Sequence, residues 1–114
     1  MKNVTAAELK KALEEGSEKI LVVDVRETDE VEEAPLLSGV AYYVNLPLSV
    51  IQMMPGEEVK RRFEELSEKA GTKLDETRII LSCRSGARSG AAQAMLSQCG
   101  IEAENLEGGY IGWF

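Results

Sequence analysis

The chain has 114 residues, of which 44% are hydrophobic and 29% are charged, and this length predicts one domain spanning residues 1–114. Twenty acidic residues against thirteen basic ones give a net charge of −7, which argues against nucleic acid or an anionic membrane surface as a partner. The chain contains no histidine, so Ser-His-Asp and Cys-His catalysis and histidine metal sites are excluded.

The two cysteines, Cys83 and Cys99, fit neither a disulfide framework nor a zinc site by number or spacing. Nothing in the sequence implies a metal or an organic cofactor. No apolar run approaches the length of a membrane span, and residues 1–5 lack the apolar region of a signal peptide. These features predict a cytoplasmic protein in which both thiols are reduced.

The first third of the chain predicts a helix, a buried strand and an acidic segment. Thr5 and Glu8 have the spacing of a capping box, so a helix is expected to begin there, and Gly16 ends it. The run at residues 20–25, apolar apart from Asp24, predicts a buried strand. Residues 27–33 are dense in acid and predict a short helix or loop, either as a solvated surface or as a docking face for a basic partner.

The middle of the chain predicts one more strand and then a long helix. Pro35 and Gly39 predict a turn, and residues 40–46 predict a strand because aromatic and β-branched side chains favour extended backbone. Residues 53–56 predict a loop. Residues 57–70 repeat apolar side chains at helical spacing, which predicts an amphipathic helix.

The last third of the chain repeats this alternation of strand and helix. Residues 78–81 predict a third buried strand, residues 87–98 a helix that Gly100 ends, and residues 103–106 a short final strand. Strands that alternate with helices predict an α/β fold, with a mainly parallel central sheet flanked by helices on both faces.

Cys83 lies between a predicted strand and a predicted helix. Ligands bind at the carboxyl ends of strands in open parallel sheets, so Cys83 is placed for chemistry. Gly86 permits the loop to turn tightly, so that its backbone N–H groups can form an anion nest beside the helix N-terminus. Arg84 and Arg88 can add full positive charges. Together these features favour a Cys83 thiolate without help from histidine.

A lone cysteine at the end of a strand is often only a small buried hydrophobe. The glycine, the two arginines and the helix start that follow Cys83 favour a reactive nucleophile over that interpretation. For Cys99 the buried hydrophobe is the favoured interpretation, because Cys99 lies near the end of a helix with Met95 four residues before it. Cys99 is expected to be core or partly exposed, without a redox role.

Four short segments match, in order along the chain, the signature stretches of one protein family. They are Val22-Val-Asp-Val-Arg26 with the acidic turn after it, Val44-Asn-Leu-Pro47, Cys83-Arg-Ser-Gly-Ala-Arg-Ser89, and Leu106-Glu-Gly-Gly-Tyr-Ile-Gly-Trp113. Each string is a weak sign alone, but their number and order are specific. The chain resembles the rhodanese-like sulfurtransferases, and the resemblance implies a single rhodanese-like domain.

The resemblance also implies sulfur transfer by a covalent, ping-pong mechanism. Cys83 would attack the outer sulfur of an anionic donor, such as thiosulfate, a persulfide or a polysulfide, and hold it as a Cys83 persulfide. An acceptor would then take the sulfur: cyanide, or a thiol of a small molecule or of a thioredoxin-like protein. The expected donor-binding residues are those of the loop: Arg84, Ser85, Gly86, Ala87, Arg88 and Ser89.

Four of these residues carry more specific expectations. Arg84 is the first candidate to bind the negative oxygens of the donor. Arg88 is the second, and pairing with an acidic residue that braces the loop is an equally good interpretation. Asp24 and Arg26 are expected to give polar support beneath the loop rather than to take part in chemistry.

Two other functions stay open. Phosphatases and arsenate reductases of related fold place five residues between cysteine and arginine, whereas only four separate Cys83 from Arg88. The shorter loop makes a tighter cradle, which suits a sulfur atom better than a tetrahedral oxyanion. The main alternative is a non-catalytic rhodanese-like module for binding or regulation, against which the presence of Cys83 with both arginines argues.

Overall fold

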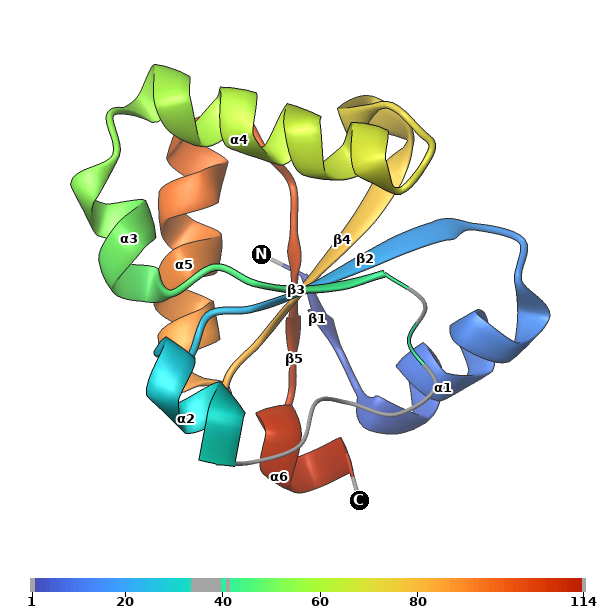
Figure 1. The fold of residues 1–114 in the computed structure, drawn as a ribbon. Coiled ribbons are helices and arrows are strands. Elements are labelled where there is room, and N and C mark those ends of the chain that lie inside the picture. The colour runs from blue at the N-terminus through green and yellow to red at the C-terminus, as the bar shows by residue number, and fades with distance from the viewer. Residues whose placement is uncertain (1, 34–39, 41, 114) are drawn as a thin grey trace.

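A computed structural model of the chain describes residues 2–33, 40 and 42–113 (Figure 1). In this part of the chain, five strands form one sheet in the order β1-β5-β4-β2-β3, and every neighbouring pair is parallel. The strands are β1 (Asn3–Val4), β2 (Lys19–Asp24), β3 (Tyr43–Asn45), β4 (Thr77–Ser82) and β5 (Glu104–Leu106). The predicted α/β class with a parallel central sheet is confirmed.

Helices cover both faces of this sheet. Figure 1 shows α3, α4 and α5 on one side of the strands and α1 and α6 on the other. The described helices are α1 (Ala6–Glu15), α2 (Thr28–Glu33), α3 (Leu48–Met53), α4 (Gly56–Lys69), α5 (Ala87–Gln98) and α6 (Gly109–Trp113), with a 3-10 turn at η1 (Leu74–Glu76). None of the helices in the described ranges is both long and apolar enough to cross a lipid bilayer.

Alternate side chains of β2 enter two separate hydrophobic cores. Leu21 and Val23 pack in the core beneath α3, α4 and α5, whereas Ile20 and Val22 pack in the core beneath α1 and α6. Successive side chains of a strand point to opposite faces, so a strand buried on both faces reads as one continuous apolar run. This explains why the apolar pattern at residues 20–25 does not alternate.

The first helix begins and ends where the sequence predicts. The backbone N–H of Thr5 donates to Glu8 Oε1 at 3.0 Å, and the N–H of Glu8 donates to Thr5 Oγ1 at 3.1 Å. Gly16 follows the helix with a left-handed φ of 66°. The helices at 57–70 and 87–98 and the strands at 20–25, 78–81 and 103–106 are also found, with ends that differ by at most one residue.

Several short elements were absent from the predicted pattern. They are β1, α3, η1 and α6, and each is too short for a hydrophobic period to show. The strand expected over 40–46 is limited to Tyr43–Asn45 in the described residues. The turn predicted at Pro35 and Gly39 lies outside the described residues.

Cys99 follows α5 and is half-buried, in contact with the core beneath α3, α4 and α5. A Cβ added to Gly56, at the start of α4, would lie 3.6 Å from the Cys99 sulfur. This is the position expected for a cysteine that packs against a core.

Candidate active site

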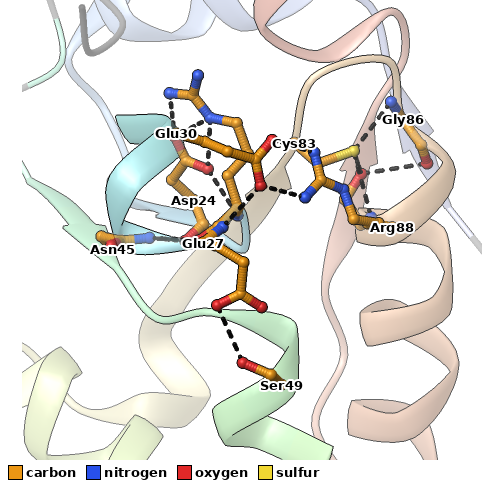
Figure 2. Close-up of polar contacts among 10 residues, drawn as sticks. Asp24, Glu27, Glu30, Asn45, Ser49, Cys83, Gly86 and Arg88 are labelled. Atoms are coloured by element: carbon orange, nitrogen blue, oxygen red, sulfur yellow. Dashed lines mark hydrogen bonds and ion pairs between the residues drawn. The ribbon is translucent and has the colours of Figure 1, made fainter. Parts of the chain in front are cut away.

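Cys83 is the first residue after β4, the middle strand of the sheet, and only 1% of it is exposed. The chain turns at once through residues 84–86 into α5. Gly86 makes this turn with a φ of 105°, a conformation that side chains disfavour. The turn brings the start of α5 back onto the cysteine, so that the sulfur lies inside the loop (Figure 2).

Three groups of the loop converge on the Cys83 sulfur. The backbone N–H of Gly86 donates to Sγ at 3.0 Å, and the backbone N–H of Ser89 donates to it at 3.4 Å. The Ser89 hydroxyl lies 3.3 Å from the same sulfur. Two backbone N–H groups and one hydroxyl of the loop thus surround the sulfur.

The hydrogen bonds decide the acidity of the Cys83 thiol. Burial raises the pKa of Cys83, but the side chain and backbone of Ser89 and the backbone N–H groups of Gly86 and Ser85 together outweigh it, so the pKa lies below that of an ordinary thiol. Donors that point at sulfur stabilise the charged form. These hydrogen bonds therefore stabilise the thiolate form of Cys83 in a chain without histidine.

The two arginines of the loop have different surroundings. Arg84 is exposed, and within the described part of the chain its side chain has no hydrogen-bond or ion-pair partner. Arg88 forms a two-bond ion pair with Glu30 of α2, with N–O distances of 2.5 and 2.8 Å. Figure 2 shows the Arg88 guanidinium between the Glu30 carboxylate and the Cys83 sulfur.

The ion pair of Arg88 and Glu30 changes the interpretation of the acidic segment. Its hydrogen bonds lower the pKa of Glu30 to about 2 and raise the pKa of Arg88. Glu30 is thus neither only a solvated charge nor only a docking group, because it holds the first turn of α5 beside the cysteine. The role of Arg88 in donor binding stays a prediction.

Asp24 and Arg26 form a buried ion pair at the carboxyl end of β2. They are 0% and 2% exposed, and Arg26 Nη2 lies 2.7 Å from Asp24 Oδ2. The Tyr43 hydroxyl donates to the same carboxylate oxygen at 2.5 Å. Burial, followed by this bond to Asp24, raises the pKa of Tyr43, and the bond to Asp24 raises the pKa of Arg26. The pair lies next to β4, and its role as polar support for the loop stays a prediction.

Asn45 ties this pair to the neighbouring strand. Its side-chain N–H groups donate to the carbonyl oxygens of Asp24 and Arg26, each at 2.9 Å. The backbone N–H of Val25 donates to the Ser82 carbonyl at 2.8 Å, which links the end of β2 to the end of β4. The residue just before the cysteine is therefore braced through β2.

Four residues of the site were not singled out from the sequence. They are Tyr43, Asn45, Asn105 and Gly109, and all of them approach Cys83 or its supports from strands or helices distant in the chain. Asn45 and Gly109 lie inside segments that match the family signatures, and Asn105 directly precedes one. Their position in or beside a signature segment was the sequence feature that could have identified them as site residues. No group of three or more potential metal ligands occurs among the described residues.

The chain is thus a parallel α/β protein with a cysteine site in the loop between a strand and a helix. Backbone N–H groups hold this cysteine at the carboxyl end of the middle strand. The family model of the rhodanese-like domain matches residues 5–114. The chain belongs to the rhodanese-like domain family, which confirms the resemblance seen in its signature segments.

Similar proteins agree with this assignment. The chain is 29% identical over 113 residues to the Bacillus subtilis (strain 168) protein named "Putative sulfurtransferase YtwF", covering 99% of this chain and 90% of that protein. It is 30% identical over 101 residues to the Schizosaccharomyces pombe protein named "Putative thiosulfate sulfurtransferase, mitochondrial", covering 86% and 66%. The crystal structure of a rhodanese-like domain protein from Staphylococcus aureus matches with a TM-score of 0.74 at 26% identity, covering 100% of this chain and 92% of that one.

Proposed function

We propose that the protein is a sulfurtransferase in which Cys83 takes a sulfane sulfur from an anionic donor and passes it to a thiol or cyanide. The observation that carries this proposal is the set of N–H groups directed at the Cys83 sulfur, which stabilise negative charge there. The names of the two similar proteins support the same class of reaction.

The first half-reaction is a displacement at sulfur. The Cys83 thiolate attacks the outer sulfur of thiosulfate, the S–S bond of the donor breaks, and sulfite leaves with the bonding electron pair. A persulfide or polysulfide donor reacts in the same way and releases a thiolate or a shorter polysulfide. The product is a Cys83 persulfide, whose negative outer sulfur the loop N–H groups stabilise.

The second half-reaction returns Cys83 to the thiolate. Cyanide attacks the outer sulfur, the persulfide S–S bond breaks, and thiocyanate leaves. An acceptor thiol, of a small molecule or of a thioredoxin-like protein, reacts as its thiolate and leaves as a persulfide. Each half-reaction breaks one bond to the transferred sulfur and forms another, so neither needs an outside oxidant or reductant.

Arg84 is the side chain that binds the donor oxygens in this proposal. It is exposed beside the cysteine, and within the described ranges no other side chain engages it. Arg88 contributes positive charge near the sulfur while its guanidinium stays bound to Glu30. The backbone of Ser85, Gly86, Ala87 and Ser89 surrounds the transferred sulfur.

The decisive test is the mass of the intact protein after incubation with thiosulfate in the absence of reductant. The wild type and Cys99→Ser are expected to gain one sulfur atom, and Cys83→Ser is expected to gain none. Addition of cyanide should then remove the extra mass and release thiocyanate.

Other outcomes separate the remaining functions. A gain with polysulfide but not with thiosulfate keeps the mechanism and changes the donor. If a folded protein with a free Cys83 thiol forms no adduct with any donor, the sulfurtransferase proposal fails and a binding or regulatory module takes its place.

A further inference from the structure

The Ser89 hydroxyl lies among three possible acceptors but has only one proton to donate. Its oxygen is 3.3 Å from Cys83 Sγ, 3.2 Å from the Gly86 carbonyl oxygen and 2.5 Å from Asn105 Oδ1. A serine hydroxyl donates one hydrogen bond and accepts up to two. The acceptor that takes the proton therefore determines whether Ser89 meets the sulfur as a donor or as an acceptor.

The neighbours of the Gly86 carbonyl remove it from this competition. Its oxygen already accepts from the backbone N–H of Gly90 at 3.1 Å and from Asn105 Nδ2 at 3.2 Å. A carbonyl oxygen has two lone pairs, and these two donors use both. The same contact sets the orientation of the Asn105 amide, because only its NH₂ group can face a carbonyl, so Oδ1 faces Ser89.

We propose that Asn105, on β5, is a positioning residue for Cys83, because it accepts the Ser89 hydroxyl proton and so decides how Ser89 meets the sulfur. In the thiol form, Cys83 S–H donates to Ser89 Oγ while Ser89 donates to Asn105 Oδ1. In the thiolate form, Ser89 turns its proton from Asn105 to the sulfur. Asn105 and the Cys83 thiolate thus compete for one proton.

This competition has a defined direction. Removing the Asn105 oxygen frees the Ser89 proton, and the charged sulfur attracts it more strongly than the neutral Gly86 carbonyl does. The thiolate gains a hydrogen bond that it otherwise shares with Asn105. Asn105 therefore restrains ionisation of Cys83, while the backbone N–H groups of Gly86 and Ser89 favour it.

Charged groups around the loop do not take the place of the hydrogen bonds that join Asn105, Ser89 and Cys83. Those near the site are Arg84, Arg88 with its partner Glu30, and the buried pair Asp24 and Arg26. In the described part of the chain, the Ser89 hydroxyl and the Asn105 amide form their side-chain hydrogen bonds with Cys83, with Gly86 and with each other. Their effect on Cys83 is therefore the same whether or not Asn105 is present.

The inference deepens the role proposed for Cys83, but its test needs only the titration of the thiol and no sulfur transfer. The rate of iodoacetamide alkylation is measured against pH for the wild type, Asn105→Ala, Ser89→Ala and the double variant. Trypsin cleaves after Arg78 and Arg84, so Cys83 and Cys99 fall on different peptides and are quantified separately by mass spectrometry. Cys99 then serves as an internal reference.

Asn105→Ala is expected to lower the pKa of Cys83 by about half a unit or more, roughly a threefold change in its ionisation constant. In the Ser89→Ala background the same substitution is expected to leave the pKa unchanged, because the hydrogen bonds through Ser89 are already lost. Gln93→Ala is the matched control: it removes a buried amide of α5 that donates to the carbonyl oxygens of Lys2 and Ala103, and it should not move the Cys83 pKa.

A shift of equal size in both backgrounds, an upward shift or no shift would overturn the proposal, since a merely structural role does not depend on Ser89. If Asn105→Ala fails to fold, Asn105→Asp replaces it. The added carboxylate should raise the pKa of Cys83, and by more in the presence of Ser89 than in its absence. Equal increases in the two backgrounds would again overturn the proposal, whatever the outcome of the thiosulfate experiment.

Discussion

The backbone of Gly109, at the start of α6, lies directly against the backbone of Cys83. Gly109 has a φ of 51°, and a Cβ added there would overlap the Cys83 carbonyl oxygen and lie 2.9 Å from the carbonyl carbon and oxygen of Arg84. Two residues further on, the N–H of Ile111 donates to the Arg84 carbonyl at 3.1 Å. The last helix therefore supports the cysteine loop from the face opposite α5.

Gly109→Ala is expected to destabilise the fold more than the φ angle alone requires. A left-handed conformation costs an L residue about 1–2 kcal/mol, and overlap with fixed neighbours typically adds about 1–3 kcal/mol. Gly16→Ala is the matched control, because Gly16 has a φ of 66° with no atom within 4 Å of its added Cβ. Urea unfolding should give a clearly larger loss for Gly109→Ala, and equal losses would show that the backbone contact gives way easily.

The buried pair of Asp24 and Arg26 predicts a large stability effect. Asp24→Ala should lower the free energy of unfolding by about 3–5 kcal/mol, because a buried guanidinium loses the carboxylate beside it. Tyr43→Phe, which removes one hydrogen bond to that carboxylate, should cost about 1–3 kcal/mol. Denaturant titration measures both, and an Asp24→Ala protein as stable as the wild type would contradict the assigned role.

A partly exposed pair supplies the comparison for that experiment. Arg78 bonds to Glu104 at 2.6 and 2.9 Å on the surface of β4 and β5. Exposed ion pairs contribute about 0–1 kcal/mol, so Arg78→Ala should cost far less than Asp24→Ala.

The ion pair of Glu30 and Arg88 predicts a pH dependence with a defined sign. Because the folded pKa of Glu30 is about 2, below its ordinary value of 4.5, the pair stabilises the fold above about pH 4.5, and this contribution is lost as pH falls toward 2. Glu30→Gln should therefore be less stable than the wild type at neutral pH and equal to it near pH 2. The difference should be small, about 1 kcal/mol or less, because the Glu30 side chain is 34% exposed.

The carboxyl carbon of Glu30 reports this titration directly by NMR. A midpoint near the ordinary value would mean that the ion pair does not persist in solution. Glu27→Gln is a suitable control, because the Glu27 carboxylate accepts an exposed hydrogen bond from Ser49, while its contact with the Glu30 carboxylate comes from the backbone N–H, which the substitution keeps.

The two loop arginines are expected to act differently in donor binding. Arg84→Ala should raise the KM for thiosulfate about tenfold, the loss expected for one charge-assisted hydrogen bond of roughly 1.5 kcal/mol, and leave thermal stability unchanged. Arg88→Ala should lower thermal stability, because it breaks the bond to Glu30. Steady-state kinetics and thermal unfolding separate the two effects, and an unchanged KM for Arg84→Ala would remove Arg84 from the donor site.

Local signals in the sequence were sufficient for most of the fold. The capping box at Thr5, the unbroken apolar run of β2 and the helical spacing of α4 depend on neighbours within a few residues, so they are readable without the fold. The short elements β1, α3 and α6 were not readable in this way. Their backbone pairs with, or packs on, segments far along the chain, and a stretch of two to six residues contains no period.

The candidate site also combines features that local sequence predicts with contacts that only the folded chain creates. Sequence by itself determined that Cys83 lies between a strand and a helix, that glycine and arginine follow it in the loop, and that no histidine of this chain can activate it. The partner of Arg88, the short approach of Gly109 and the contact of Asn105 with Ser89 join residues 16 to 58 positions apart. Only the tertiary structure decided these contacts, because the crossover connections of a parallel sheet bring the ends of separate strands together, and no local pattern encodes which side chains then meet.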